Sequence, residues 1–227
     1  MKKIVLIGGG DIGRGNTIYE TKEIDEEIVK MSNKINPNFL FIGLASNFSD
    51  SYYDTIKKIY KNLGCNTQYL KKKNIINNKD ITKDKIMSAD IIYIGGGDSI
   101  KLISEVKEYE IDKLLKEAYE KGTVIAGISA GAILLSNEGF SDSLILRGEN
   151  DKYSFIKGLN LININICPHY NIDIEKNKQL KEQIKDRQVY GLENCTALIV
   201  EDNKTRIIKS NNNNVYLISN LKEEKLN

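Results

Sequence analysis

The chain has 227 residues, enough to bury one sizeable hydrophobic core, and α/β folds of this length commonly form a single domain. Its 33 basic and 31 acidic residues leave a net charge of +2, which gives no global case for a nucleic-acid or membrane partner. The longest apolar runs are strand-sized, so no membrane span is expected, and three cysteines without a shared motif suit a reducing cytoplasm. The start, MKKIVLIGGG, is interpreted as a first strand rather than a signal peptide, because its apolar run is short and ends in glycines.

Strands and helices alternate along the first 135 residues. Short apolar runs predict strands, and apolar residues at helical spacing predict helices between them. The predicted strands cover residues 3–7, 38–44, 67–70, 89–94 and 123–126, and the predicted helices cover residues 17–35, 50–63, 82–87, 99–106 and 110–121. This alternation predicts an α/β fold with a doubly wound, mostly parallel sheet that binds ligands at the carboxyl edge of its strands.

The pattern changes after residue 136. Residues 139–147 are interpreted as a loop or hairpin, and residues 174–184 as a helix. Further strands are predicted over residues 161–166, 188–191, 197–201, 205–209 and 215–219. The last two are expected to form a C-terminal β-hairpin around the asparagines at 211–214. No linker-like stretch divides the chain, so residues 1–227 are expected to form one domain.

Glycines follow the first predicted strand in a pattern that formally matches a dinucleotide-binding loop. Gly8, Gly10 and Gly13 satisfy G-x-G-x-x-G. Residues 14–16, however, delay the next helix, so no helix N-terminus lies where a pyrophosphate would bind, and residues 45–47 supply no acid for a ribose hydroxyl. We therefore expect no cofactor, and we interpret these glycines as a loop that approaches other backbone closely.

Ser129 lies between two glycines, where a predicted strand turns into a predicted helix. The segment 127–131, GISAG, matches the G-x-S-x-G nucleophile elbow, in which a sharp turn exposes the serine hydroxyl at the sheet edge. The N–H of Ala130, at the helix start, is a candidate donor to an oxyanion, with Gly96 or Gly97 as the second donor. The simpler alternative is a β-to-α turn that needs small residues for packing.

His169 is the only histidine in the chain, and it directly follows a predicted strand. A serine nucleophile needs a nearby base, and imidazole is the usual one because its pKa lies near neutrality. We therefore expect His169 to lie beside Ser129. Cys167 is a weaker candidate nucleophile, because no helix N-terminus lies beside it to lower its pKa. Cys167 and His169 alone cannot complete a tetrahedral zinc site, so no metal is expected.

The sequence does not identify which carboxylate would orient the imidazole. Asp142 lies shortly after the predicted helix that follows Ser129, and Glu193 follows the end of a predicted strand. Asp98 and Asp173 are weaker options. The alternative for each of them is an ordinary solvated carboxylate with no role at the site.

Five motifs together give the chain a resemblance to a known family. They are IGGG after the first strand, YIGGGDS, GISAGA, PHY and the late segment GLENCTALIV. Over most of its length the chain resembles peptidase family S51, the group of aspartyl dipeptidase (peptidase E) and cyanophycinase. The resemblance implies a flavodoxin-like sheet similar to that of class I glutamine amidotransferases, with serine in place of their cysteine. It also implies a serine peptidase with Ser129 as nucleophile, His169 as base, and Gly96, Gly97 and Ala130 near the oxyanion.

The chain departs from the family pattern at the acid and at a substrate-selecting stretch. The acid that dipeptidases carry after the elbow helix falls near Asp142, and an acid frequent in the GL-x-E segment is replaced by Asn194, one residue after Glu193. Dipeptidases selective for N-terminal aspartate carry an arginine-bearing stretch after the histidine, and this chain has Arg187 only further along. A lysine can meet a carboxylate, but without the fixed bidentate fork of arginine. The stretch after the histidine holds three lysines instead: Lys176, Lys178 and Lys181.

The sequence therefore predicts a cytoplasmic serine-peptidase-like hydrolase that cleaves small peptides, acidic dipeptides among them, through an acyl-enzyme on Ser129. A small peptide is the expected partner, with no nucleic acid or membrane, and a homodimer is left open. The alternatives are a small esterase of the α/β-hydrolase fold and a non-catalytic ligand-binding protein on the amidotransferase-like scaffold. Ser129 and Asp142 are only 13 residues apart, which fits that esterase fold poorly. A binding protein would not need the Ser129/His169 pair.

Overall fold

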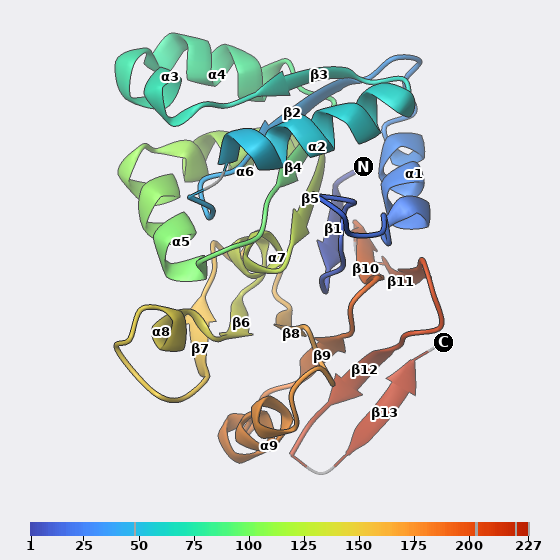
Figure 1. The fold of residues 1–227 in the computed structure, drawn as a ribbon, viewed down its shortest axis with the longest axis vertical. Coiled ribbons are helices and arrows are strands. Elements are labelled where there is room, and N and C mark those ends of the chain that lie inside the picture. Colours follow the sequence, from blue (N-terminus) through green and yellow to red (C-terminus); the bar gives the residue numbers. More distant parts are fainter. Residues whose placement is uncertain (48, 203, 221, 227) are drawn as a thin grey trace.

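The computed structural model describes residues 1–47, 49–202, 204–220 and 222–226, which form two β-sheets flanked by helices (Figure 1). The first sheet has the strand order β11-β10-β1-β5-β4-β2-β3. The five strands from β1 to β3 in this order are parallel, whereas β10 runs antiparallel to both of its neighbours. The bounds of the strands are β1 (Lys3–Ile7), β2 (Asn38–Ile42), β3 (Asn66–Tyr69), β4 (Ile91–Ile94), β5 (Val124–Ile128), β10 (Thr196–Glu201) and β11 (Lys204–Lys209). The predicted mostly parallel α/β fold is confirmed.

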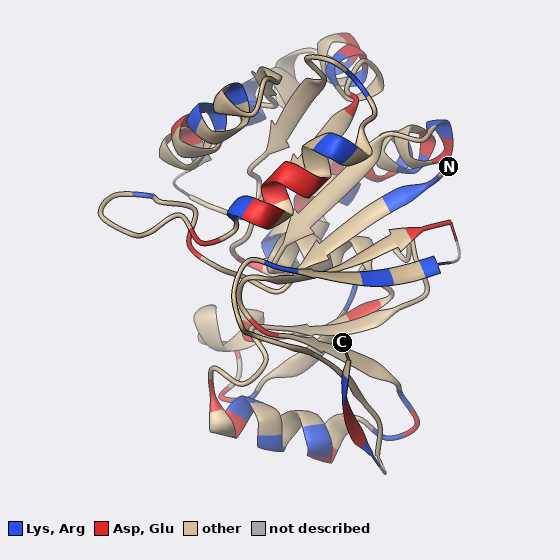
Figure 2. Ribbon diagram, turned by 90° about the vertical axis from the view of Figure 1, so that its right-hand side faces the viewer, with Lys and Arg blue, Asp and Glu red and all other residues tan. Residues whose placement is uncertain are grey.

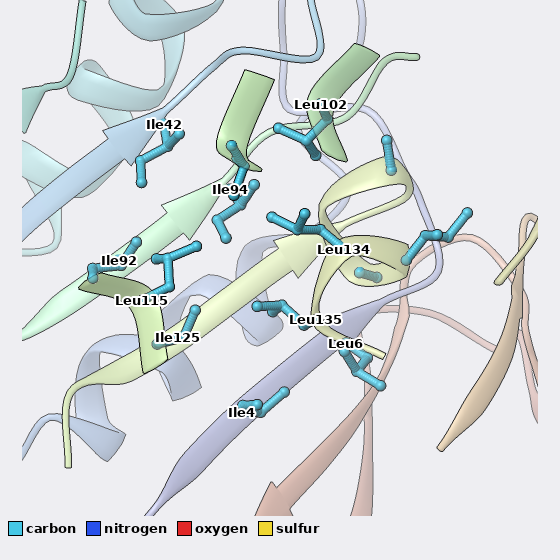
Figure 3. Packing of buried hydrophobic residues seen from close by; sticks show 14 of the residues in the cluster. Ile4, Leu6, Ile42, Ile92, Ile94, Leu102, Leu115, Ile125, Leu134 and Leu135 are labelled. Atoms are coloured by element: carbon cyan, nitrogen blue, oxygen red, sulfur yellow. The ribbon is translucent and has the colours of Figure 1, made fainter. Parts of the chain in front are cut away.

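Helices cover both faces of the first sheet, because successive strand residues point to opposite sides. Val5, Phe39 and Phe41 pack on the face covered by α1 and α2. Ile4 and Ile92 pack on the other face, against α5, α6 and α7 (Figure 3). The bounds of the helices are α1 (Lys22–Met31), α2 (Ser49–Asn62), α3 (Lys72–Asn77), α4 (Lys79–Met87), α5 (Ser99–Glu108), α6 (Ile111–Lys121) and α7 (Ala130–Leu135). Every residue of α7 is buried, which accounts for its small and apolar sequence.

The second sheet has the order β13-β12-β9-β8-β6-β7, and β8 runs parallel to both of its neighbours. It lies beside the carboxyl edge of the first sheet, below it in Figures 1 and 2. Phe140, Tyr170 and Leu180 belong to its separate apolar cluster, which includes residues of α9. The bounds are β6 (Glu138–Ser141), α8 (Ser143–Leu146), β7 (Ser154–Lys157), β8 (Asn165–Pro168), α9 (Ile174–Gln183), β9 (Val189–Leu192), β12 (Val215–Ile218) and β13 (Glu223–Leu226).

The C-terminal hairpin is present, but it is not centred on the asparagines. β11 pairs with β10 in the first sheet, whereas β12 pairs with β9 and β13 in the second. Residues 211–214 therefore carry the chain from one sheet to the other, and β12 and β13 form the hairpin. The expected location was wrong because turn composition does not specify which distant strand a segment pairs with.

Charged residues of both signs are interspersed on the outer surfaces of the helices in the view of Figure 2. Within the described ranges, none of the helices combines the length and apolar composition needed to cross a membrane.

Candidate active site

Ser129 lies at the turn between β5 and α7. Its backbone has φ 54° and ψ −111°, a conformation that residues other than glycine rarely adopt. Its N–H donates to the carbonyl of Ile7 at 3.0 Å, which ties the turn to the end of β1. A Cβ at Gly127 would overlap the backbone of Gly131, so the turn requires glycine there. The turn places Ser129 at the carboxyl edge of the first sheet.

His169 reaches Ser129 from the second sheet. It follows β8 with a φ of 55°, and its N–H donates to the carbonyl of Gly8 at 2.9 Å. Its Nε2 lies 2.8 Å from Ser129 Oγ. The structure thus brings together the two side chains that were expected from the sequence to lie beside each other, although they follow strands of different sheets.

Asn194 is the second hydrogen-bond partner of the imidazole. Its Oδ1 lies 2.8 Å from His169 Nδ1. Because an amide oxygen only accepts, Nδ1 carries the proton, and Nε2 of the neutral ring is free to accept from the Ser129 hydroxyl. A Cβ at Gly9 would overlap both Asn194 Oδ1 and the imidazole, so the close approach expected of this glycine loop is to the His169–Asn194 pair. The three side chains form a continuous hydrogen-bonded chain.

The imidazole forms no hydrogen bond with the two carboxylates considered from the sequence, within the part of the chain that is described. Asp142 precedes α8 and affects His169 only through its charge. The Glu193 carboxylate points elsewhere, accepting from Asn171 Nδ2 and from the N–H of Asn214, each at 2.6 Å. The expectation of a carboxylate partner is therefore corrected to Asn194. Both residues lie in the turn between β9 (Val189–Leu192) and β10, and of the two only Asn194 bonds to the imidazole in the described part of the chain.

Asp98 and Asp173, the weaker options, cap helices instead. Asp98 accepts from the N–H groups at the start of α5 at 2.9 and 3.2 Å and lies 3.3 Å from Arg147. Asp173 accepts from the N–H of Glu175 at 2.9 Å and from the hydroxyl of Tyr153 at 2.6 Å. Both carboxylates thus have structural roles.

The surroundings of His169 favour its neutral form. Burial lowers the pKa of the imidazole, and the positive charge of Lys176 lowers it further, while the hydrogen bond with Asn194 and the charge of Asp142 act in the opposite direction. Lys176 is itself buried, and its Nζ donates to the carbonyl of Pro168 at 2.6 Å. The imidazole therefore stays neutral, with a lone pair that can accept a proton, down to a lower pH than an ordinary histidine does.

A pocket of about 290 Å³ opens in front of Ser129 and His169. It is lined by the glycine loop after β1, the loop after β4 and the first turn of α2, with Arg14, Gly96 and Tyr52 among its residues. Arg14 is exposed, and its guanidinium lies 5.5 Å from the centre of the Tyr52 ring. Neither Arg14 nor Tyr52 could be placed at this site from the sequence, because no local pattern brings them beside a serine more than 75 residues away.

The three expected oxyanion residues lie near Ser129 in different ways. A Cβ at Gly96 would lie 3.3 Å from the Ser129 Cβ, so the backbone of Gly96 runs alongside the serine. Ala130 begins α7, and the first N–H groups of a helix lack acceptors within the helix. Gly97 also lines the pocket, but a Cβ there would overlap the carbonyl of Ala45, so close packing against the loop after β2 already accounts for this glycine.

The lysines after His169 do not line this pocket. Besides the buried Lys176, Lys178 is exposed on α9, and Lys181 pairs with Glu223 at 2.8 Å. Arg187 pairs with Glu138 at 2.7 Å. The cation that lines the pocket is Arg14 instead.

Other candidate chemistry lies apart from this pocket. Cys167 is fully buried, and burial raises the pKa of its thiol to about 11, so it stays protonated at neutral pH. A larger cavity, of about 620 Å³, lies near the amino end of β1, where Lys2 and Glu120 form an ion pair at 2.6 Å. Among the described residues, no group of three or more His, Cys, Asp or Glu side chains is arranged to hold a metal ion.

The fold is similar to those of solved peptidases. A peptidase from an acI-B1 Actinobacterium superposes with a TM-score of 0.74 at 19% identity, covering 99% of this chain and 93% of that one. A putative peptidase E from Listeria monocytogenes superposes with a TM-score of 0.69 at 22% identity, covering 92% and 98%. In sequence, the chain is 31% identical over 179 residues to the uncharacterized peptidase YgaJ of Bacillus subtilis, 79% of this chain and 72% of that protein. It is 25% identical over 229 residues to peptidase E of a Nostoc species, covering 95% and 88%.

These relatives and the match to a family model define a serine-type peptidase. The model, that of peptidase family S51, covers residues 4–208. The chain belongs to this family, as its motifs suggested.

Proposed function

We propose that the protein hydrolyses short peptides, with Ser129 as nucleophile, His169 as general base and acid, and Asn194 as the residue that orients the imidazole. The observation that carries this proposal is the continuous hydrogen-bonded chain from Ser129 Oγ through both imidazole nitrogens to Asn194 Oδ1, with 2.8 Å at each step. Its serine end faces a pocket large enough for a small ligand.

The reaction follows from the direction of these hydrogen bonds. As Ser129 Oγ bonds to the substrate carbonyl carbon, its proton passes to His169 Nε2. When the C–N bond breaks, the imidazolium returns this proton to the leaving amine, and an acyl ester remains on Ser129. A water molecule then attacks the ester, with Nε2 as its base, and the carboxylate product leaves as Oγ regains a proton.

The strained turn at Ser129 fits a nucleophile elbow. A positive φ at a serine is energetically unfavourable, and a β-to-α turn that serves only packing does not require it. The turn leads directly into Ala130 at the start of α7, and the backbone of Gly96 runs alongside the serine. The N–H groups of Ala130 and Gly96 are the proposed oxyanion donors, with Gly97 supporting the loop.

A neutral amide in the orienting position is compatible with this chemistry. Cysteine peptidases of the Cys-His-Asn type use an asparagine to fix the tautomer and orientation of their histidine. Asn194 holds the Nδ1 proton in the same way, but it adds no negative charge to stabilise the imidazolium. We therefore infer a weaker base than in a Ser-His-Asp enzyme, with its working range extended toward lower pH.

The position of Arg14 supports the proposal that the substrates are short peptides with a free carboxylate. In the described part of the chain its guanidinium forms no ion pair with a carboxylate, and it lines the same pocket as Ser129. A planar guanidinium suits bidentate binding of a carboxylate. An acidic side chain or the C-terminus of a dipeptide would supply that group.

The test is covalent labelling of Ser129 together with hydrolysis of a dipeptide panel. Wild-type protein, Ser129→Ala, His169→Ala and the control Ser104→Ala, an exposed serine on α5, are treated with a fluorophosphonate and analysed by intact mass. Wild type and Ser104→Ala should gain one adduct and cleave dipeptides, whereas the two site variants should lose activity by about 10⁴-fold or more. An unlabelled wild type that cleaves no dipeptide of the panel would refute the proposal.

A further inference from the structure

Tyr52 lines the Ser129 pocket, and its phenol hydroxyl lies beside Gly96 in the loop after β4. The residue lies in the first turn of α2, its ring packs edge-on against Phe41 with the centroids 5.0 Å apart, and only 8% of the residue is exposed. Its oxygen lies 3.5 Å from the backbone nitrogen of Gly96, which donates to it in a long and therefore weak hydrogen bond. The hydroxyl is thus fixed beside the loop that runs alongside Ser129.

The hydroxyl proton of Tyr52 has no acceptor within the described ranges, since the contact with Gly96 uses the oxygen only as an acceptor. Burial raises the pKa of Tyr52 to about 12, so the group stays protonated at neutral pH. An unused donor in a nearly buried position is costly unless a ligand accepts from it. The pocket is the place from which such an acceptor can come.

Gly96 links this hydroxyl to the reacting centre. The hydroxyl oxygen and the Gly96 nitrogen are 3.5 Å apart, so one oxygen atom can lie within hydrogen-bond distance of both. The backbone of Gly96 lies so close to Ser129 that an added Cβ would come within 3.3 Å of the serine Cβ. A carbonyl attacked by Ser129 would therefore present its oxygen near the two donors.

We propose that Tyr52 is a catalytic residue whose O–H donates to the oxyanion, beside the N–H of Gly96. This inference rests on the proposed serine mechanism and adds a side-chain donor to it. As the C–O double bond opens, the oxyanion replaces the long contact between Gly96 and Tyr52 and accepts a hydrogen bond from each. The negative charge stays on the oxygen, and no proton is transferred from the phenol.

Arg14 strengthens Tyr52 as a donor. Its guanidinium lies 5.5 Å from the ring centre, and its positive charge acts to lower the pKa of the phenol, against the larger effect of burial. A more acidic O–H donates more strongly to an anion, while the group remains protonated. Arg14 is thus a positioning and tuning residue for Tyr52, in addition to its proposed contact with the substrate.

The test compares Tyr52→Phe with Tyr93→Phe. Tyr93 belongs to the same apolar cluster, and its buried hydroxyl has no partner among the described residues, so its removal deletes the same atom away from the pocket. Tyr52→Phe should lower kcat for a dipeptide and the rate of phosphonylation of Ser129 by about 10²-fold, with KM changed less than twofold. Tyr93→Phe should match the wild type in all three measurements.

A second variant at the same position separates a lost donor from lost packing. Placing 4-aminophenylalanine at position 52 supplies an N–H donor and should recover most of the rate, even if Tyr52→Phe lowers the melting temperature. The inference is overturned if Tyr52→Phe keeps kcat and the phosphonylation rate within twofold of Tyr93→Phe. A rise in KM alone would overturn it too, because that result assigns the hydroxyl to ground-state binding. If wild type is neither labelled nor active, the serine mechanism itself fails, and this inference with it.

Discussion

His169 is half-buried and Asp25 is fully buried, and both side chains are held by hydrogen bonds, but their partners differ in kind. Asp25, in the first turn of α1, is fully buried and accepts from the hydroxyls of Tyr60, Thr21 and Tyr19 at 2.7, 2.8 and 2.9 Å. Burial raises the pKa of this carboxyl to about 6, and the three hydrogen bonds only partly oppose that effect.

The imidazole of His169, by contrast, lies at a pocket and has one neutral partner behind it. Asn194 fixes the Nδ1 proton, and the opposite nitrogen faces Ser129. Among the described residues, the side-chain partners of the Asp25 carboxylate are thus hydroxyl groups, and the imidazole of His169 has no hydrogen bond to a carboxylate. Titration of Asp25, which is buried among hydroxyl groups, should therefore alter folding stability, whereas titration of His169, which faces a pocket, should alter reactivity.

Removing the neutral partner of His169 should have the largest effect. Asn194→Leu leaves Nδ1 without an acceptor, so the ring can rotate or place its proton on Nε2, and kcat should fall by about 10³-fold. Asn177→Leu, on α9 and away from the pocket, should leave kcat unchanged. Steady-state kinetics of the two purified variants measure the difference. Activity of Asn194→Leu within tenfold of wild type would show that Asn194 does not orient the base.

A carboxylate in place of the neutral amide tests how the charge of its partner affects His169. In Asn194→Asp, a negative charge beside Nδ1 should raise the pKa of the imidazole and move the acid limb of the kcat/KM profile to higher pH. Activity should therefore fall in mildly acidic buffer and be kept or increased above neutral pH. A pH–rate profile identical to that of wild type would contradict the account of the site.

Asp25 should show its titration in stability instead. Its folded-state pKa of about 6 lies above the unfolded value of 3.8, so the folded state holds the proton more tightly. This contribution to stability is complete below about pH 4 and is lost as pH rises through about 6, and its size is about 3 kcal/mol. The free energy of unfolding of wild type, measured relative to Asp25→Asn, should therefore fall by that order between pH 4 and pH 7. A constant difference across this range would mean that Asp25 titrates normally.

The contrast also separates what the sequence could predict from what it could not. Ser129 and His169 each follow a strand, so local pattern placed both at the edge of the sheet. The glycines packed against them were recognisable because close approach excludes a Cβ. Asn194 was considered only as the loss of an acid, because an amide carries no signal of an orienting role outside its contact with the imidazole.

Long-range pairing limited the prediction of the fold in the same way. The parallel sheet follows from local alternation, and the five predicted strands overlap β1 to β5. The second sheet brings β8 beside β6 and β9, and β12 beside β9, and these pairings depend on contacts between distant segments. Arg14 and Tyr52 were missed for the same reason, since tertiary packing alone brings both to the Ser129 pocket.

The smallest expected effect concerns the charge behind the imidazole. The buried ammonium of Lys176 lowers the pKa of His169, so Lys176→Met should raise that pKa and move the acid limb of kcat/KM to higher pH. Because the base must be unprotonated, activity should fall a fewfold in mildly acidic buffer and stay unchanged above pH 8. Lys178→Met, which removes an exposed charge from the same helix, should leave the profile unmoved. If Lys176→Met shifts the limb no further than Lys178→Met, then burial, Asn194 and the charge of Asp142 set the basicity of His169, and the buried ammonium of Lys176 does not contribute to it.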